Sequence, residues 1–518
     1  MALTKSLKEI IAEDRTGLLG QHLSWERVCL RDVAEVLNGY PFESNLFQSA
    51  NGMPLIRIRD VQTGSTNTYF SGEFDNQFLV NPGELLVGMD GDFNSARWKA
   101  KPSLLNQRVC KLTVDERFYS DRLLELVLPG FLAAIHAETS SVTVKHLSSR
   151  SIQEIELPLP PAAEQTRIVE KLEELLSDLD AGVAELKAAQ KKLIQYRQSL
   201  LKAAVEGALT ADWRKGQPAA PAESGAALLA RILTERRSRW ETRQLAKFQA
   251  QGKAPPKDWQ AKYPEPVAPD AAGLPELPLG WVWATVDQLS PDDLANGRSV
   301  LTAESGAKVL RLTAVKHGQI DLNQCKIGAW SVAEAKPFAV VQGDLLIVRG
   351  NGSLTLVGRA GMVPAVTEQV AYPDTMIRLR VVDSVVRPEW VGLLWDAAIT
   401  RSHLEARART SAGIYKISQP DIVSVVIPVP PLNEQDLMLS MFKQTSEEMQ
   451  MVQAMVERGL KQSAAQRKNI LQAAFSGQLV PQDPADEPAS ALLARIRAER
   501  AAHASGATRH RGKKKEAA

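Results

Sequence analysis

The sequence lacks the residue patterns that usually mark a catalytic or metal centre. Its three cysteines, Cys29, Cys110 and Cys325, lie far apart and leave one unpaired in any pairing, so neither a disulfide framework nor a thiolate metal site is indicated. The seven histidines show no spacing typical of metal ligands. No glycine-rich phosphate loop followed by Lys-Ser or Lys-Thr occurs, which argues against an ATP-driven motor in this chain.

Long apolar runs are missing as well. No segment approaches the length of a membrane span, and residues 3–11 are too polar for a signal peptide because Lys5 and Lys8 interrupt them. The formal net charge of +2 over 518 residues says little about partners. These features predict a soluble cytoplasmic protein in a reducing compartment.

One long stretch occurs twice without a gap. Residues 160–207 match residues 430–477 at a constant offset of 270 positions. In both copies apolar or small residues recur at alternating steps of three and four, which is the spacing of a coiled coil. The matched residues are Pro161 and Pro431, Glu164 and Glu434, Gln165 and Gln435, and Gly207 and Gly477.

Each copy predicts a long helix. About 44 residues at 1.5 Å each span roughly 65 Å, far more than a globular core requires. A double proline is expected to begin each helix and a glycine to end it. We expect residues 160–210 and 430–480 to pair as an antiparallel coiled coil; a helical pair with a purely structural role fits the same pattern.

The duplication extends to the segments that precede these helices. Trp25 corresponds to Trp281 and Gly83 to Gly343, at offsets of 256 and 260 positions. The sequence therefore predicts an α+β fold with two mixed α/β domains in tandem and two long antiparallel helices. The expected segments are an N-terminal helix at 1–22, a first domain at 23–159, a helix at 160–210, a proline-rich linker with a basic helix at 211–276, a second domain at 277–429, a helix at 430–480, and a C-terminal helix with a basic tail at 481–518.

Local patterns inside the domains predict individual elements. The alternation of apolar and charged residues from Leu55 to Arg59 predicts a strand. Asn81-Pro82-Gly83 predicts a turn ahead of an apolar strand, and apolar spacing over residues 122–137 predicts a helix. Polar, glycine-rich loops follow buried strand-like runs at residues 88–98 and 349–359. Their arginine and asparagine residues suit phosphate and base contacts, but the same composition is equally typical of ordinary surface turns.

Two enzymatic alternatives can be assembled from the sequence. Asp292, Glu334 and Lys336 form a loose nuclease-like arrangement that would require magnesium. The string at residues 38–42, Asn-Gly-Tyr-Pro-Phe, approaches the base-holding loop of an adenine methyltransferase, but it lacks the proline pair, and no cofactor-binding glycine turn accompanies it. Both strings are also common on loop and helix surfaces.

A mixed domain that ends in Pro-Pro-x-x-Glu-Gln and continues into a long helix, with the whole arrangement repeated, resembles the specificity subunit of type I restriction-modification systems. The resemblance covers essentially the full chain. It implies two target-recognition domains that each read one half of a split double-stranded DNA site, with the paired helices setting the gap. A coiled-coil adaptor that binds only proteins remains an alternative.

The resemblance also implies partners. Two methyltransferase subunits carrying S-adenosylmethionine would dock against the helices, and restriction subunits would add ATP-driven translocation and Mg²⁺-dependent cleavage, so that this chain itself binds no metal or cofactor and is not an enzyme. The residues expected to dock subunits are Pro161, Glu164, Gln165, Pro431, Glu434 and Gln435.

No individual base contact can be transferred from the family, because its recognition domains vary freely. The candidate DNA-binding residues therefore come from the two loops, from charged positions on strand-like runs, and from the ends of the domains. They are Arg57, Arg59, Asp90, Asp92, Asn94, Arg97, Trp98, Lys145, Arg311, Arg349, Asn351, Ser353, Arg359, Tyr415 and Lys416.

Overall fold

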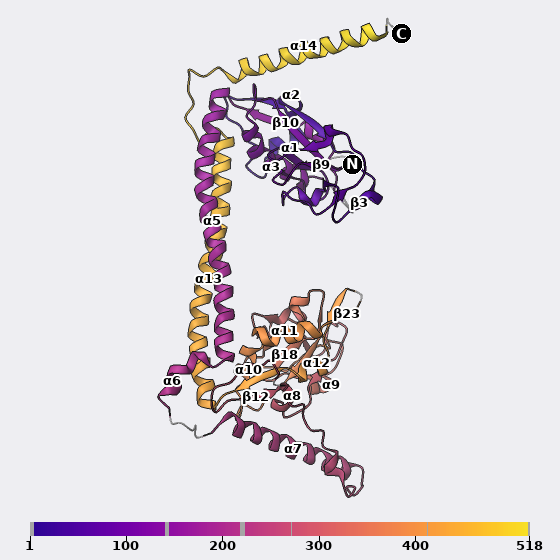
Figure 1. Cartoon of the computed structure of the whole chain (residues 1–518), viewed down its shortest axis with the longest axis vertical. Helices are drawn as coiled ribbons and strands as arrows, with labels where there is room; N and C mark the ends of the chain where they lie inside the picture. The colour runs from indigo at the N-terminus through magenta and orange to yellow at the C-terminus, as the bar shows by residue number, and fades with distance from the viewer. Residues whose placement is uncertain (1–4, 140–144, 218–222, 271, 412, 516–518) are drawn as a thin grey trace. The chain divides into compact units, whose positions relative to one another are not determined.

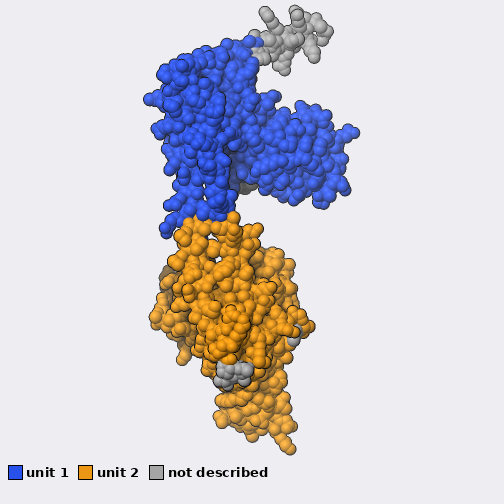
Figure 2. All heavy atoms as spheres, turned by 60° about the vertical axis from the view of Figure 1, so that its left-hand side comes forward, with its two compact units in different colours: residues 1–187, 457–518 blue, residues 188–456 orange. Residues whose placement is uncertain are grey.

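The computed structural model describes residues 5–139, 145–217, 223–270, 272–411 and 413–515. The chain forms two compact units that do not follow its order (Figures 1 and 2). Unit 1 comprises residues 1–187 and 457–518, and unit 2 comprises residues 188–456. Each unit contains one mixed domain and a part of both long helices.

Both predicted long helices are present. Helix α5 covers Ala162–Val205 and helix α13 covers Leu432–Phe475, each with 44 residues. Each begins directly after its proline pair, where the fixed proline φ suits the first turn. Each ends before a glycine with positive φ, 69° at Gly207 and 71° at Gly477, because glycine adopts this left-handed conformation without a steric penalty.

The helices pair antiparallel within each unit. In unit 1, Arg467 donates to Asp180 at 2.6 Å, and a Cβ added at Gly459 would lie 3.1 Å from the side chain of Leu186. In unit 2, Leu201 and Phe442 belong to one hydrophobic cluster. Residue numbers thus rise along α5 as they fall along α13, and Figure 1 shows the two helices side by side.

The first mixed domain is built on two sheets and lies in unit 1. Helix α3 (Asp121–Ala137) packs on an antiparallel four-stranded sheet of order β2-β10-β7-β8, and a second sheet has the order β3-β5-β4-β9-β6. The strands of the first sheet are β2 (Ala34–Asn38), β7 (Leu85–Gly88), β8 (Asn94–Arg97) and β10 (Val109–Val114). Those of the second are β3 (Phe47–Gln48), β4 (Met53–Ile56), β5 (Tyr69–Phe70), β6 (Leu79–Val80) and β9 (Ser103–Leu105).

The second mixed domain repeats this plan in unit 2. Its largest sheet has six strands in the order β13-β22-β18-β20-β16-β15, and two three-stranded sheets have the orders β17-β14-β21 and β19-β24-β23. The six strands are β13 (Ala295–Asn296), β15 (Val315–Lys316), β16 (Gln319–Ile320), β18 (Leu345–Val348), β20 (Ala360–Met362) and β22 (Met376–Leu379). The others are β14 (Lys308–Leu310), β17 (Cys325–Ile327), β19 (Gly350–Asn351), β21 (Val370–Ala371), β23 (Arg409–Ser411) and β24 (Ile414–Lys416).

A two-stranded antiparallel ribbon closes each domain beside its long helix. In unit 1, β1 (Glu26–Cys29) pairs with β11 (Glu156–Leu159), and in unit 2, β12 (Val282–Thr285) pairs with β25 (Val426–Val429). The residues that enter each domain are therefore fixed to those that leave it, directly before the double proline. This ribbon positions the start of the long helix on its own domain.

Three further helices, α1 (Leu7–Glu13), α7 (Gly225–Ala250) and α14 (Ala489–Lys515), lie outside the two mixed domains. Helix α7, the predicted basic helix, joins the core of unit 2, and helix α14 joins the core of unit 1. Helix α1 ends where Asp14 adopts a φ of 31°, so the helix predicted over residues 1–22 is too long. No helix in the described part of the chain is long and apolar enough to cross a bilayer.

The strand predicted from Leu55 to Arg59 is only half correct. Strand β4 ends at Ile56, and Ile58–Asp60 form a turn of 3-10 helix. The Asp60 carboxylate accepts a hydrogen bond from the backbone N–H of Arg57 at 2.9 Å, which closes this turn and removes Arg57 from the sheet. The predicted helix over residues 122–137 is confirmed as α3, and the predicted turn before Leu85 contains Gly83 with a φ of 93°.

Candidate nucleic-acid interface

The Glu-Gln pair at the start of α5 fixes this helix to the first domain. Glu164 is fully buried and accepts a hydrogen bond from the indole N–H of Trp25 at 2.9 Å and another from the Gln482 amide. The Gln165 amide accepts from the backbone N–H of Ser120 at 2.7 Å and donates to the carbonyls of Phe118 and Pro160. These contacts hold the start of α3 and the end of the ribbon on α5.

The same Glu-Gln pair fixes the start of α13 to the second domain in unit 2. Glu434 is 1% exposed and accepts from the indole N–H of Trp281 at 2.8 Å and from the hydroxyl of Thr210 at 2.6 Å, and it is paired with Arg214. Gln435 accepts from the backbone N–H of Arg387 and donates to the Pro430 carbonyl.

The assignment of this motif to subunit docking therefore needs correction. All six residues, Pro161, Glu164, Gln165, Pro431, Glu434 and Gln435, are buried within their own units. Their polar groups already have internal hydrogen-bond partners, so they join a domain to its helix rather than face a partner subunit.

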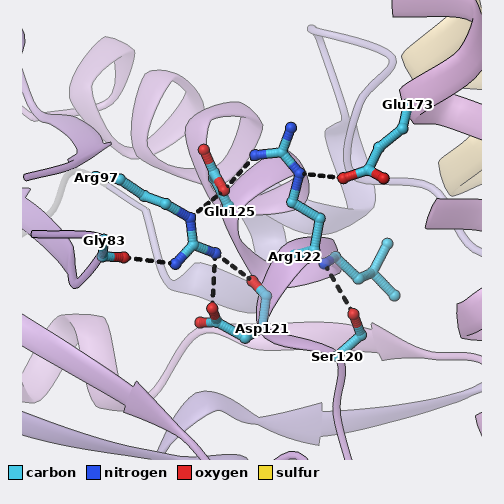
Figure 3. A network of polar contacts seen from close by, with 8 residues as sticks. Gly83, Arg97, Ser120, Asp121, Arg122, Glu125 and Glu173 are labelled. Carbon is cyan, nitrogen blue, oxygen red and sulfur yellow. Dashed lines mark hydrogen bonds and ion pairs between the residues drawn. The ribbon is translucent and has the colours of Figure 1, made fainter. Parts of the chain in front are cut away.

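Two candidates in the loop at residues 88–98 serve the fold, and Figure 3 shows the contacts of one of them, Arg97. Arg97 donates to Glu125 at 2.6 Å and to the Gly83 carbonyl at 2.7 Å, and it forms an ion pair with Asp121 at 2.7 Å, which ties β8 to α3. Burial raises the pKa of Glu125, but hydrogen bonds from Arg122 and Arg97 outweigh it, so the net pKa lies below its ordinary value.

Trp98 is the clearest correction among the candidates. It is 1% exposed, lies in a hydrophobic cluster, and donates its indole N–H to the Lys101 carbonyl at 3.0 Å. A side chain in this position has no face left for a base. Arg97 and Trp98 are thus removed from the set of DNA-contacting residues, because their interactions are satisfied inside unit 1.

The structure brings the remainder of this loop onto the end of the first domain. The backbone N–H of Gly91 donates to the Lys145 carbonyl at 2.9 Å, and that of Leu147 donates to Met89 at 2.7 Å. Between these bonds Asp90 faces His146, whose Nδ1 lies 2.5 Å from the Asp90 carboxylate. Lys145 itself donates to the His136 carbonyl at the end of α3.

Asp92 and Asn94 follow on the same loop. The Asp92 side chain is exposed, and its carboxylate lies 3.6 Å from the His136 imidazole. Asn94 begins β8 and donates its amide to the Asp92 carbonyl at 2.8 Å, which folds the loop back on itself. Two segments that are far apart in the sequence therefore meet in one surface, which contains Asp90, Asp92, Asn94 and Lys145.

Unit 2 assembles its candidates in the same way. Strand β24 lies between β19 and β23, so that Asn351 faces Tyr415, and Lys416 faces Gly350 on one side and Arg409 on the other. The Ile417 N–H donates to the Arg349 carbonyl at 2.9 Å. The predicted loop and the predicted domain end thus meet in a small sheet.

The side chains of this sheet differ in their exposure and in their hydrogen bonding. Lys416 and Arg409 are exposed and make no side-chain hydrogen bond or ion pair within the described ranges. Ser353 lies beside Thr355, with their hydroxyls 2.9 Å apart, and its N–H donates to the Asn351 side chain. Lys416 and Arg409 are accordingly the cations best placed for a phosphate.

Four predicted arginines lie apart from these surfaces. Arg57 and Arg59 are exposed around the 3-10 turn after β4, and Arg311 is exposed and donates to the Cys325 carbonyl at 3.2 Å. Arg359 is paired with Asp396 at 2.9 Å, and Asp396 also binds Arg197 of α5. Arg359 therefore supports Asp396, which in turn joins the second domain to α5.

Sequence reasoning missed several residues of the two surfaces. Arg108 lies beside Asp90 and His146, with its Nε 3.5 Å from the Asp90 carboxylate, and Arg409 pairs with Lys416 across β23 and β24. Neither lies in a polar loop motif. The one available signal was their proximity to the ends of strands, which many other residues share.

The nuclease-like residues do not form a site. Glu334 accepts from the hydroxyl and N–H of Ser331 and caps α9 (Val332–Ala335), which lowers the pKa of its carboxyl. Asp292 is paired with Arg243 at 2.8 Å. No group of three His, Cys, Asp or Glu side chains suited to a metal ion occurs among the residues that the structure describes.

Comparison with known proteins covers nearly the whole chain. A family model described as the type I restriction modification DNA specificity domain matches residues 23–191. The specificity subunit of the type I restriction enzyme EcoBI from Escherichia coli is 32% identical over 514 residues, which cover 97% of this chain and 98% of that protein. The EcoKI specificity subunit from Escherichia coli strain K12 is 25% identical, with 87% and 89% covered. The crystal structure of the HsdS subunit from Thermoanaerobacter tengcongensis aligns with a TM-score of 0.36 and 15% identity, covering 88% of this chain and 98% of that chain.

Proposed function

We propose how this chain selects DNA from one premise: it belongs to the family of type I restriction enzyme specificity subunits. It is a DNA-recognition component of a restriction-modification complex and not a catalytic one. Neither the stand-alone nuclease nor the protein-only adaptor is supported. The mixed domains at 23–159 and 277–429 are then the target-recognition domains.

Each recognition domain reads one half of a bipartite double-stranded DNA site. The observation that carries this proposal is a shared backbone arrangement, in which the loop after a central strand pairs with the end of the same domain, occupied by different side chains. Asp90 faces His146 in unit 1, whereas Gly350 faces Lys416 in unit 2. Similar frameworks with different polar groups suit two half-sites of different sequence, because each base pair presents its own donors and acceptors.

The long helices set the distance between the half-sites. Helices α5 and α13 each contain 44 residues and take part in both units, so that they are the only two continuous elements that the described residues place in both. Their termini are fixed to the domains through the buried Glu-Gln pairs. A length change in both helices is therefore expected to change the spacing of the two halves.

The helices also dock the partner subunits, through a surface other than the Glu-Gln motif. In unit 2, Ile194 of α5 and Met451 and Met455 of α13 are 63%, 61% and 60% exposed. Met451 and Met455 lie four residues apart on one face of α13, and exposed large apolar side chains on a helix favour contact with another protein, since burial removes them from water. We assign this exposed apolar cluster to a methyltransferase subunit.

The chemistry then belongs to the partners. Two methyltransferase subunits would supply S-adenosylmethionine, and restriction subunits, where the system has them, would supply ATP-driven translocation and Mg²⁺-dependent cleavage. This chain would hold no cofactor of its own. Its place would be the cytoplasm, with the DNA that it selects.

Single-molecule mapping of DNA methylation tests this function. Host DNA would be compared in cells that express the chain with its methyltransferase and in cells that lack this chain. A bipartite adenine-methylated motif that disappears without the chain is expected. Deletion of residues of one recognition domain should abolish recognition of one half-site, and methylation that persists unchanged without the chain would refute the proposal.

A further inference from the structure

A tight turn between two strands supports the edge of the first recognition surface. Residues 106–108 connect β9 to β10, and Arg108 is one of four non-glycine residues with positive φ in the described part of the chain, at 72°. This conformation is unfavourable for a side-chain-bearing residue. The Arg108 carbonyl accepts from the N–H of Met89 at 2.9 Å, so the turn is attached directly to the loop after β7.

A second segment packs behind this turn and fixes it. A Cβ on Gly39 would overlap the carbonyl of Asn106, so only glycine fits at this position. Tyr40 donates its N–H to the Leu105 carbonyl and accepts from the N–H of Gln107, both at 2.9 Å. The aromatic side chain of Tyr40 is 49% exposed beside the turn.

The Gln107 and Arg108 side chains of the turn face solvent, whereas Asn106 is buried. The Arg108 side chain is 52% exposed, and its guanidinium lies 3.2 Å from the imidazole of His146 and 3.5 Å from the carboxylate of Asp90. Gln107 is exposed, and its side-chain amide makes no hydrogen bond within the described residues. A guanidinium supported from behind and a free amide are the groups that read guanine and adenine in the major groove.

Unit 2 contains a turn at the equivalent place, with other side chains and without a residue of positive φ. Residues 372–375 connect β21 to β22, and the Thr375 carbonyl accepts from the N–H of Arg349 at 2.8 Å. A Cβ on Gly297 would overlap the Pro373 carbonyl. Arg298 follows that glycine as Tyr40 follows Gly39, and both Arg298 and Thr375 are exposed.

We propose that these two turns, with the residue behind each, are the base-reading elements of the two recognition domains. The elements are Tyr40, Gln107 and Arg108 in the first domain, and Arg298, Asp374 and Thr375 in the second. Arg108 and Gln107 donate to purine edges, whereas Asp374 accepts from a cytosine amino group. The proposal rests on the function above and names the positions that determine specificity.

Methylation mapping of the complete complex, formed by the full chain with its own methyltransferase subunits, tests this assignment. Arg108→Gly and Gln107→Ala are each expected to relax one or two base positions in one half-site, lowering discrimination there about 10- to 100-fold. The other half-site and the spacing should not change. Asp374→Ala with Thr375→Ala is expected to relax the opposite half-site alone.

The Arg108→Gly substitution also distinguishes a role of Arg108 in DNA recognition from a role in the stability of the fold. Because glycine adopts positive φ freely, Arg108→Gly should have a melting temperature equal to or above that of the wild type. A lower melting temperature with an unchanged motif would show that Arg108 is structural and would overturn the assignment. If Arg108→Gly failed to assemble, Gln107→Ala would decide, since its exposed side chain has no internal partner.

Arg117 provides the matched control. It follows the other end of β10, is 62% exposed and is paired with Asp115 at 2.7 Å, so it resembles Arg108 in exposure and pairing. Arg117→Ala should leave the motif intact, and relaxation of the same positions by Arg117→Ala would overturn the assignment. A wild-type complex that methylates without any sequence motif would instead refute the proposed function, which keeps the two failures distinguishable.

Discussion

Glu164 and Glu434 are carboxylates that the fold removes from water, and their partners differ in charge. Glu164 accepts hydrogen bonds from two neutral groups, the Trp25 indole and the Gln482 amide. Glu434 has the Trp281 indole in the same position but is also paired with the cationic Arg214. Charge-assisted contacts are stronger than neutral ones, and a buried charge that loses its partner is costly.

The two glutamates therefore predict unequal losses of stability. Glu434→Ala removes the carboxylate partner of the Arg214 guanidinium and the acceptor of the Trp281 indole N–H, and it should lower the free energy of unfolding of unit 2 by about 3 kcal/mol. Glu164→Ala leaves only neutral donors and should cost unit 1 about 2 kcal/mol. Urea unfolding followed by tryptophan fluorescence and by proteolysis of each unit measures both. Equal losses would contradict the role given to Arg214.

His403 predicts how acid affects unit 2. Burial lowers the pKa of His403, and the neighbouring Arg407 lowers it further. The unfolded imidazole titrates near 6.5, so below that pH the unfolded state binds more protons at His403 than the folded state does. The free energy of unfolding is therefore unaffected by His403 above about pH 6.5 and decreases as the pH falls below it. His403→Gln keeps a donor but cannot titrate. Between pH 7.5 and 5 the wild type should lose more stability than this variant, and parallel curves would refute the assignment.

Secondary elements show what the sequence could and could not predict. Helices α5 and α13 were predictable because proline, heptad spacing and glycine are local signals that agree with one another. The pairing of Met89 with Leu147 was not, since it depends on contacts between distant residues, and the turn at Ile58–Asp60 replaced a strand because one buried aspartate caps it. Trp98 and Arg97 looked like interface residues on a polar loop, yet Trp98 is buried and the half-buried Arg97 is paired with Glu125 and Asp121.

The exposed apolar cluster on α5 and α13 predicts an assembly defect. Met451→Glu combined with Met455→Glu should weaken binding of the methyltransferase subunit at least about 100-fold, because burial of each methionine side chain contributes roughly 1.5–3 kcal/mol. Both methionines are exposed, so folding should be unaffected. Analytical ultracentrifugation of the complex measures the change. Gln450→Glu, which points about 100° away on the same helix, is the control, and an equal effect there would argue against this docking surface.

At the scale of the whole molecule, duplication explains how one chain can recognise an asymmetric site. Each unit has its own core and its own recognition surface, and the residues at equivalent backbone positions have diverged, as with Arg108 and Thr375. Divergence at those positions changes the sequence that is read without altering the ribbon, the Glu-Gln pair or the long helix. Specificity and assembly can therefore change independently.

If the long helices set the gap between the two half-sites, insertions of equal length in both helices should lengthen that gap. One heptad inserted after Leu186 in α5 and one after Arg458 in α13 preserve the apolar seam, since the contact between Leu186 and Gly459 places these points opposite each other. Seven residues add about 10 Å, which corresponds to about three base pairs of DNA. Methylation mapping should therefore report unchanged half-sites with a gap about three base pairs longer. An insertion in one helix alone shifts the seam by a heptad and should abolish methylation, whereas an unchanged gap after the matched insertion would refute the idea that the helices set it.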